Sequence, residues 1–299
     1  MGSADIVPGV SGGTVALVLG IYDQLIRNIS TGARGLKELL TGDVTAFRAT
    51  FRSIEWIWLI SLLAGILTAV FALSSIIEHL LDNEPVRMAA LFLGLILGSI
   101  WVALRMLDRI DAASAGLMVG IGVVFFLLLG LRSDTHAADD AAEVVTKSWW
   151  VFFVAGAIAI CAMILPGISG SFLLVMLGMY TEVLGAVNDR NFFVLAVFAL
   201  GCVVGLGLFS TLLNWLLANY HRLVLAAMIG LMLGSTRVLW PWPGGTGTTT
   251  MTLPRDDVAI PLLLVAAGAA VVVVVDLLAV RYVQVEPLPE HERAVETPS

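Results

Sequence analysis

Six long apolar segments constrain the fold of this chain more than any other feature. Each approaches or exceeds the length of about 20 apolar residues that a helix needs to cross the hydrocarbon core of a membrane. Hydrophobic residues make up 59% of the 299-residue chain and charged residues only 13%, a composition far more apolar than that of a soluble domain. We therefore expect an all-α polytopic membrane protein with spans at residues 56–81, 86–104, 112–131, 192–217, 223–238 and 258–280.

A loop that would break a helix occurs twice in the chain. The sequence Pro8-Gly9-Val10-Ser11-Gly12-Gly13-Thr14 returns 158 positions later as Pro166-Gly167-Ile168-Ser169-Gly170-Ser171-Phe172. Seven of fifteen positions are identical between residues 8–22 and 166–180. We predict that Pro8-Gly9 and Pro166-Gly167 are the breaks of two re-entrant half-helices. The first would run for twelve residues from Ser11, about 18 Å or half of the membrane core.

A second match, at an offset of 136, extends the duplication. Residues 94–99 and 230–235 share five of six positions. Each repeat therefore consists of a broken half-helix and three spans, and because three is odd, the second repeat must enter the membrane from the opposite side. The predicted organisation is repeat one at 1–131, an acidic outer loop at 132–148, repeat two at 149–283 and an acidic tail at 284–299.

The two copies of the loop differ in what precedes them. In repeat two, residues 149–165 are long enough to descend toward the middle of the membrane before the break at Pro166. Only seven residues precede Pro8. We therefore expect that the corresponding arm of repeat one is truncated, either by a start codon assigned too late or by trimming of the chain.

The distribution of positive charge predicts the orientation in the membrane. Ten Lys and Arg residues fall on the side that holds residues 23–55 and six on the other, so we expect the first side and the C-terminal tail to be cytoplasmic. Within 23–55, apolar and basic residues recur at helical spacing, which predicts either an amphipathic helix on anionic lipid or a helix that caps the bundle.

The net charge of −7 argues against nucleic acid as a partner, and nothing in the sequence indicates an oligomeric state.

The serines of the loops could belong to a hydrolase, because residues 9–13 read G-x-S-x-G. A serine nucleophile needs a base within hydrogen-bond reach. The four histidines lie instead at a helix end, in the acidic loop, in a short turn and in the tail, and the second copy has Ser171 where the motif requires glycine. We therefore expect no enzymatic activity, and the same placement of histidine argues against a metal site or other cofactor.

The glycines and hydroxyls of both loops suit an anion. A helix that begins at Ser11 or Ser169 presents unpaired N–H groups and a positive dipole end, and glycines let a ligand approach them closely. The alternative is that small residues only permit tight helix crossing while the serines cap their own helices. The residues expected to bind a phosphate are Ser11, Gly12, Gly13, Thr14, Ser169, Gly170 and Ser171.

Three ionisable residues within or beside the apolar segments are functional candidates. Arg237 could hold a phosphate with two hydrogen bonds, or its side chain could simply extend to the membrane interface. Asp5 could carry a coupling proton or cap the first half-helix, and Glu182 could serve a proton relay or lie at the outer rim. A proton gradient or a sodium gradient is accordingly the candidate driving force.

Three motifs taken together resemble the polyprenyl-phosphate transporter family called PopT, long catalogued as a domain of unknown function. They are residues 4–14, residues 165–171, and Gly234-Ser235 followed by Leu239-Trp240-Pro241-Trp242. The resemblance extends from residue 2 to about residue 282. It implies a flippase that returns an undecaprenyl-phosphate-type lipid carrier from the outer to the inner leaflet of the cell membrane, for reuse in cell-envelope glycan synthesis. The alternative is an ion-coupled transporter of a small soluble anion that uses the same half-helix N-termini.

Overall fold

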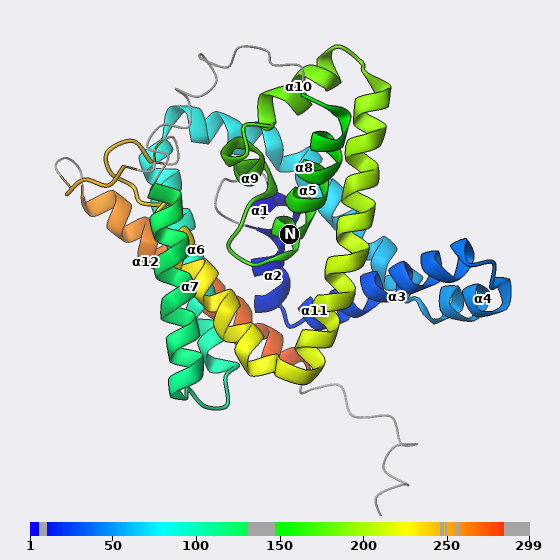
Figure 1. Ribbon diagram of the computed structural model, residues 1–299. Helices are drawn as coiled ribbons and strands as arrows, with labels where there is room; N and C mark the ends of the chain where they lie inside the picture. Colours follow the sequence, from blue (N-terminus) through cyan, green and yellow to red (C-terminus); the bar gives the residue numbers. More distant parts are fainter. Residues whose placement is uncertain (6–10, 131–146, 246–247, 249, 255–257, 284–299) are drawn as a thin grey trace, which may run out of the picture.

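The computed structural model describes residues 1–5, 11–130, 147–245, 248, 250–254 and 258–283. These residues form an α-helical structure, as the apolar segments predict (Figure 1). Residues 132–146 of the predicted outer loop and the predicted tail at 284–299 lie outside the described residues. The helices are α1 (Gly2–Asp5), α2 (Gly12–Val18), α3 (Tyr22–Leu40), α4 (Val44–Ser53), α5 (Trp56–Asn83), α6 (Pro85–Arg105), α7 (Ala112–Gly130), α8 (Trp149–Ile164), α9 (Gly170–Met176), α10 (Tyr180–Asn188), α11 (Phe192–Ser235) and α12 (Ala259–Val283).

Among the described residues, five helices are long and apolar enough to cross a membrane, namely α5, α6, α7, α11 and α12. The apolar helix α8 is shorter, with 16 residues. No residue of α5 is buried, although Ile57 and Phe71 on its surface are large and apolar, 85% and 82% exposed. Apolar surface of this extent is stable against lipid but not against water. The fold is therefore that of a polytopic α-helical membrane protein.

Helix α11 joins two of the predicted spans. It runs for 44 residues, but Tyr220 in its interior has non-helical angles, φ −136° and ψ 36°. A straight helix of this length would measure about 66 Å, more than twice the thickness of the membrane core. The break at Tyr220 turns the chain between the segments predicted at 192–217 and 223–238, and Figure 1 shows the two arms of α11 running in different directions.

Equivalent glycines in the two repeats let a helix of each repeat cross a helix of the other. In α6, a side chain at Gly94 or Gly98 would overlap the backbone of α12 at Val265 and Ala269. In the second arm of α11, the equivalent Gly230 and Gly234 would overlap α7 in the same way, at Met118 and at Gly122 with Phe125. Each copy of the duplicated motif thus contacts a helix from the other half of the chain. Such close crossings are how helices associate in lipid, where no hydrophobic force drives them together.

The first arm of α11 packs along α8 at a similarly short distance. Side chains at Gly156, Gly201 and Gly205 would each overlap the backbone of the facing helix. Both cysteines lie in this interface as free thiols, and each donates to a backbone carbonyl of the other helix: Cys161 Sγ to Gly205 O at 3.6 Å and Cys202 Sγ to Gly156 O at 3.4 Å. Both are packing residues.

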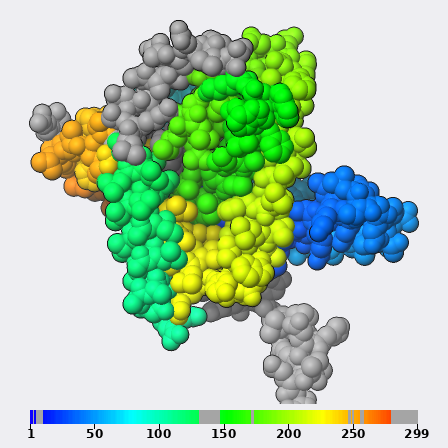
Figure 2. Space-filling view, in the orientation of Figure 1, coloured from blue at the N-terminus to red at the C-terminus, as the bar shows by residue number. Residues whose placement is uncertain are grey.

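Helices α3 and α4 form a hairpin that projects from the side of the helical body (Figures 1 and 2). The expectation of a single amphipathic helix within 23–55 is wrong in this respect, because Gly42, with φ 82°, turns the chain between two helices. The base of α3 is anchored by Ile26, which is fully buried. Near the tip, Gly35 lets α4 approach closely at Thr50, and Leu40 is 80% exposed.

The position of this hairpin bears on the two alternatives for residues 23–55. A helix that caps the bundle would lie across its end, whereas the α3–α4 hairpin extends away from it in Figure 2. Arg34, Lys37, Arg48 and Arg52 are spread along the hairpin beside its exposed apolar residues. This arrangement favours contact with the lipid surface.

Candidate functional site

The two helices that follow the duplicated loops, α2 and α9, have the same length and the same ending. Helix α9 begins 158 positions after helix α2, and both helices contain seven residues. Both end at a glycine in the left-handed region, Gly20 with φ 69° and Gly178 with φ 62°, and both show the same pair of closing hydrogen bonds. This is the Schellman ending, in which glycine avoids the steric penalty of positive φ. Each helix is about 10 Å long. This is shorter than the length of about 18 Å expected for twelve residues, because the glycine ends the helix early.

The hydroxyl of Ser11 links the first loop to the second. Its oxygen accepts a hydrogen bond from Gly13 N at 3.0 Å and so caps α2. The same hydroxyl donates across to the break of the second repeat, with Leu165 O at 3.1 Å and Met163 O at 3.3 Å as acceptors. Ser11 is 1% exposed. The side chain of Ser169 does not cap α9 in this way.

A second hydrogen bond joins the loops in the opposite direction. The Gly167 N–H donates to Thr14 Oγ1 at 3.1 Å, and both residues are buried. Gly167 has φ 84° and lies against Met232 of α11, where a Cβ would come within 2.8 Å of the backbone. Only glycine fits both the angle and the space. Pro166 and Gly167 therefore form a buried turn in contact with both α2 and α11.

The remaining glycines of the site serve this close approach. A Cβ at Gly13 would lie 2.5 Å from Ile164 O, and a Cβ at Gly170 would overlap Met163. The structure thus brings together the first loop and the residues just before and after Pro166. Pro8 and Gly9 lie outside the described residues, as do the side chains of Ser171 and Asp5.

Tyr22 is a further member of the site that the sequence reasoning did not select. Its hydroxyl donates to Ile164 O at 3.1 Å, and its side chain is 2% exposed. Burial, and secondarily the charge of Asp23, raise the pKa of the phenol, so the group stays protonated and remains a donor. Its identity with Tyr180 in the second copy is the sequence signal that could have identified it.

The described loop hydroxyls lie in a sealed interface in this conformation. Ser11, Thr14 and Ser169 are 1%, 2% and 7% exposed, and Ser11 and Thr14 bond to the backbone. The alternative of caps and tight crossings accounts for these contacts. Anion binding by the same residues stays a prediction, and it requires that the two loops separate.

Arg237 lies just after the C-terminal end of α11, the helix that contacts the second loop at Met232. It follows the end of α11 and is half-buried, with its guanidinium over the ring of Phe126 at 4.9 Å and directly against Gly130 of α7. It comes five positions after Met232, which contacts Gly167. Arg237 is therefore close in sequence to a residue that contacts the second loop, but its side chain contacts α7. A guanidinium stacked on an aromatic ring is oriented without losing its charge.

The remaining candidate, Glu182, is a half-buried residue in the first turn of α10. Its predicted role in proton coupling stays a prediction, as does that of Asp5. Among the described residues, no group of three His, Cys, Asp or Glu side chains could hold a metal ion.

The fold and the site together define a polytopic membrane protein in which two broken helices, one from each half of the chain, meet at buried Pro-Gly and Ser-Gly turns. A family model described as "VCA0040-like: Undecaprenyl phosphate translocase-like" matches residues 1–254. The chain belongs to this family.

Two curated relatives agree with the family assignment. A polyprenyl-phosphate transporter of Vibrio cholerae is 41% identical over 242 residues, which cover 81% of this chain and 75% of the relative. A polyprenyl-phosphate transporter of Staphylococcus aureus is 31% identical over 254 residues, which cover 81% of this chain and 83% of the relative. No solved structure matches the chain.

Proposed function

We propose that this protein is a flippase that moves polyprenyl phosphate from the outer to the inner leaflet of the cell membrane, so that the lipid carrier can be reused in envelope glycan synthesis. The two relatives named polyprenyl-phosphate transporters support this substrate. The observation that carries the mechanism is the direct contact between the two duplicated loops, Ser11 to Leu165 and Gly167 to Thr14.

The proposed architecture is a pair of inverted repeats with re-entrant half-helices. Three observations support it: the identical endings of α2 and α9, the equivalent glycine crossings of α6 with α12 and of α11 with α7, and the contact between the loops. Repeats related in this way place the substrate at their interface near the middle of the membrane, and they rock about it. The proposed orientation places the α3–α4 hairpin and the C-terminal tail in the cytoplasm.

The phosphate would bind where the loops now contact each other. Separation of the loops frees the hydroxyls of Ser11 and Thr14 and the N–H group of Gly167 from their partners in the other loop, and it opens the backbone at Gly13 and Gly170 to a ligand. Because α2 and α9 are only seven residues long, these hydroxyl and N–H donors, rather than a helix dipole, supply most of the attraction. The isoprenoid tail would stay in the surrounding lipid throughout.

Arg237 would contribute the positive charge. From its stacked position against α7 it would receive the phosphate from the outer leaflet and hold it with two parallel hydrogen bonds. Inward movement would be driven by a proton gradient or a sodium gradient, with Asp5 and Glu182 as the candidate proton carriers.

The test is the amount of polyprenyl phosphate accessible on the outer face of cells or of proteoliposomes, measured with a membrane-impermeant probe. Loss of the protein should raise this amount, and Ser11→Ala, Ser169→Ala and Arg237→Gln should each have the same effect. Arg87→Gln is the matched control, because Arg87 is an arginine paired with Glu84 at the start of α6. Unchanged lipid accessibility in cells without the protein would refute the function. Protein-dependent uptake of a soluble anion in its place would favour the alternative transporter.

A further inference from the structure

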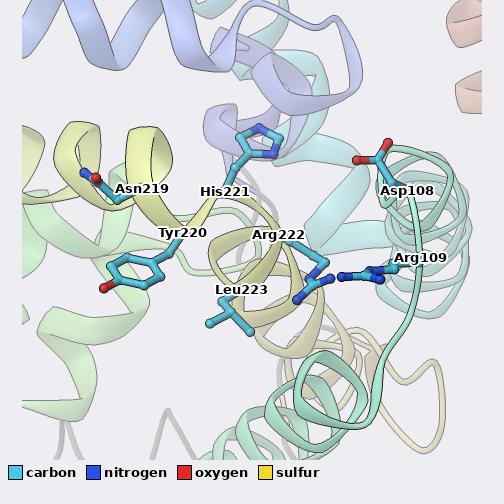
Figure 3. Close-up of a pocket in the computed structure, with 7 residues that line it drawn as sticks. All are labelled: Asp108, Arg109, Asn219, Tyr220, His221, Arg222 and Leu223. Atoms are coloured by element: carbon cyan, nitrogen blue, oxygen red, sulfur yellow. The ribbon is translucent and has the colours of Figure 1, made fainter.

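A polar pocket of about 350 Å³ opens where α11 kinks, away from the duplicated loops (Figure 3). Two segments distant in sequence form it: the connection between α6 and α7, with Asp108 and Arg109, and the kink itself, from Asn219 to Leu223. The volume is about ten times that of one water molecule in the liquid, which leaves room for a phosphate group with ordered water.

Two arginines from different elements meet in this pocket. Figure 3 shows the guanidinium groups of Arg109 and Arg222 pointing toward one another. Like charges in this arrangement repel, unless an anion lies between them. Planar guanidinium groups bind phosphate oxygens with paired hydrogen bonds, so two of them form a suitable clamp for one phosphate.

The charges around the clamp leave one arginine uncompensated. Arg222 Nη2 is 2.9 Å from Asp111 Oδ2, and Asp111 Oδ1 also accepts from Ser114 N at 3.0 Å. Arg109 makes no ion pair with any residue that the structure describes. The carboxylate of Asp108 is directed away from both guanidinium groups in Figure 3. Arg222 is thus fixed in position by Asp111, while Arg109 keeps its charge available.

A third basic residue, His221, lines the pocket, but its side chain is directed away from the two guanidinium groups in Figure 3. His221 Nε2 is 3.6 Å from Asp23 Oδ2, at the start of α3 and one residue after the buried Tyr22. This contact ties the kink to the segment that follows the first duplicated loop. The pocket is therefore connected to the proposed transport site through α3 as well as through α11.

The second arm of α11 spans the distance between the loops and the pocket. Leu223 lines the pocket, and Met232 on the same arm contacts Gly167. Nine residues of helix separate them, or about 14 Å. Arg237 lies beyond Met232, so the two positive positions fall at opposite ends of this arm, with the loop contact between them.

We propose that the pocket at the α11 kink is a binding site for a phosphate group, clamped by Arg109 and Arg222. The ligand is either the phosphate headgroup of the lipid at the end of its passage or free inorganic phosphate. The lipid assignment rests on the proposed function; the phosphate chemistry rests on the paired guanidinium groups alone. In the orientation proposed above, the site is the last contact of the headgroup before its release on the cytoplasmic side.

Equilibrium binding to the full-length protein in nanodiscs tests the proposal, with radiolabelled inorganic phosphate in one arm and a short-chain polyprenyl phosphate in the other. Arg109→Gln should weaken binding about tenfold, since one charge-assisted contact is lost. Arg109→Lys should retain part of the affinity. Arg105→Gln is the control, because Arg105 lies four residues earlier in the chain, does not line the pocket, pairs with Asp276 at 3.4 Å and stacks on Trp101. Arg109 is exposed, so its replacement should leave folding intact, which helicity and size-exclusion profiles would verify.

The outcomes separate the two sources and the two proposals. Arg109-dependent binding of the lipid, displaced by inorganic phosphate, supports the headgroup site. Arg109-dependent binding of inorganic phosphate alone assigns free phosphate and overturns the lipid assignment. Equal affinities of the Arg109→Gln and Arg105→Gln proteins overturn the site altogether. Lipid transport by the same protein is a separate measurement. If transport is absent while Arg109-dependent phosphate binding is intact, the proposed function is refuted and the phosphate site is still supported.

Discussion

Thr14→Val removes one hydrogen bond between the duplicated loops and almost nothing else. Valine has the shape of threonine, so no cavity forms, but the buried Gly167 N–H loses its acceptor, now 3.1 Å away. An unsatisfied buried donor costs about 1–3 kcal/mol. We expect the free energy of unfolding to fall by that amount. If the contact holds the loops closed, the equilibrium between closed and separated loops should shift about 5- to 150-fold toward separation.

The measurement is reversible unfolding of the purified protein in bicelles, compared with Thr68→Val. Thr68 is exposed on α5, and its hydroxyl donates to Ala64 O within its own helix, so its loss should change little. Thr14→Ser keeps the acceptor and should recover most of the stability. Equal stability of the Thr14→Val and Thr68→Val proteins would refute the conclusion that the loops are held together by this bond.

Three further outcomes follow from the packing. Gly94→Ala should destabilise the protein by about 1–3 kcal/mol in the same unfolding assay, since the new Cβ would overlap the backbone of α12. Gly116→Ala on α7 is the control: the space around Gly116 is open, so the change should be neutral or slightly stabilising. Tyr22→Phe should cost about 1 kcal/mol in thermal unfolding, and an unchanged melting temperature would contradict its role as donor. A spin label at Leu40 should report the depth of lipid headgroups in an anionic bilayer; full accessibility to aqueous relaxants would exclude the lipid contact of the hairpin.

The spans were predictable because a membrane leaves the sequence few choices. Each long apolar segment appears as a helix within a few residues of the expected bounds, from α5 at Trp56–Asn83 to α12 at Ala259–Val283. The break at Pro166-Gly167 was equally clear, because a Pro-Gly turn is a local feature. The left-handed glycines that end α2 and α9 are local as well, but the expected length of the first helix did not take them into account and was too long. The interruption between the spans predicted at 192–217 and 223–238 is confirmed at Tyr220, although the chain there kinks within α11 and does not leave the helix for a loop.

The partners of the site residues were not predictable. The sequence identified Ser11 and Thr14 as hydroxyl donors for a ligand, whereas the structure shows them bonded to the backbone at 163–167. It assigned Arg237 to the same site, but the guanidinium stacks on Phe126. Each of these contacts joins residues more than a hundred positions apart, and no periodicity carries that information.

The sequence by itself determined that this chain crosses a membrane and that its two halves carry the same broken element, because hydrophobicity and turn chemistry act over a few residues at a time. Only the tertiary structure decided that the two elements meet, that equivalent glycines bring α6 to α12 and α11 to α7, and that the kink at Tyr220 gathers Arg109 and Arg222 in one pocket. These features depend on how distant helices pack, and packing depends on the shapes of both partners at once.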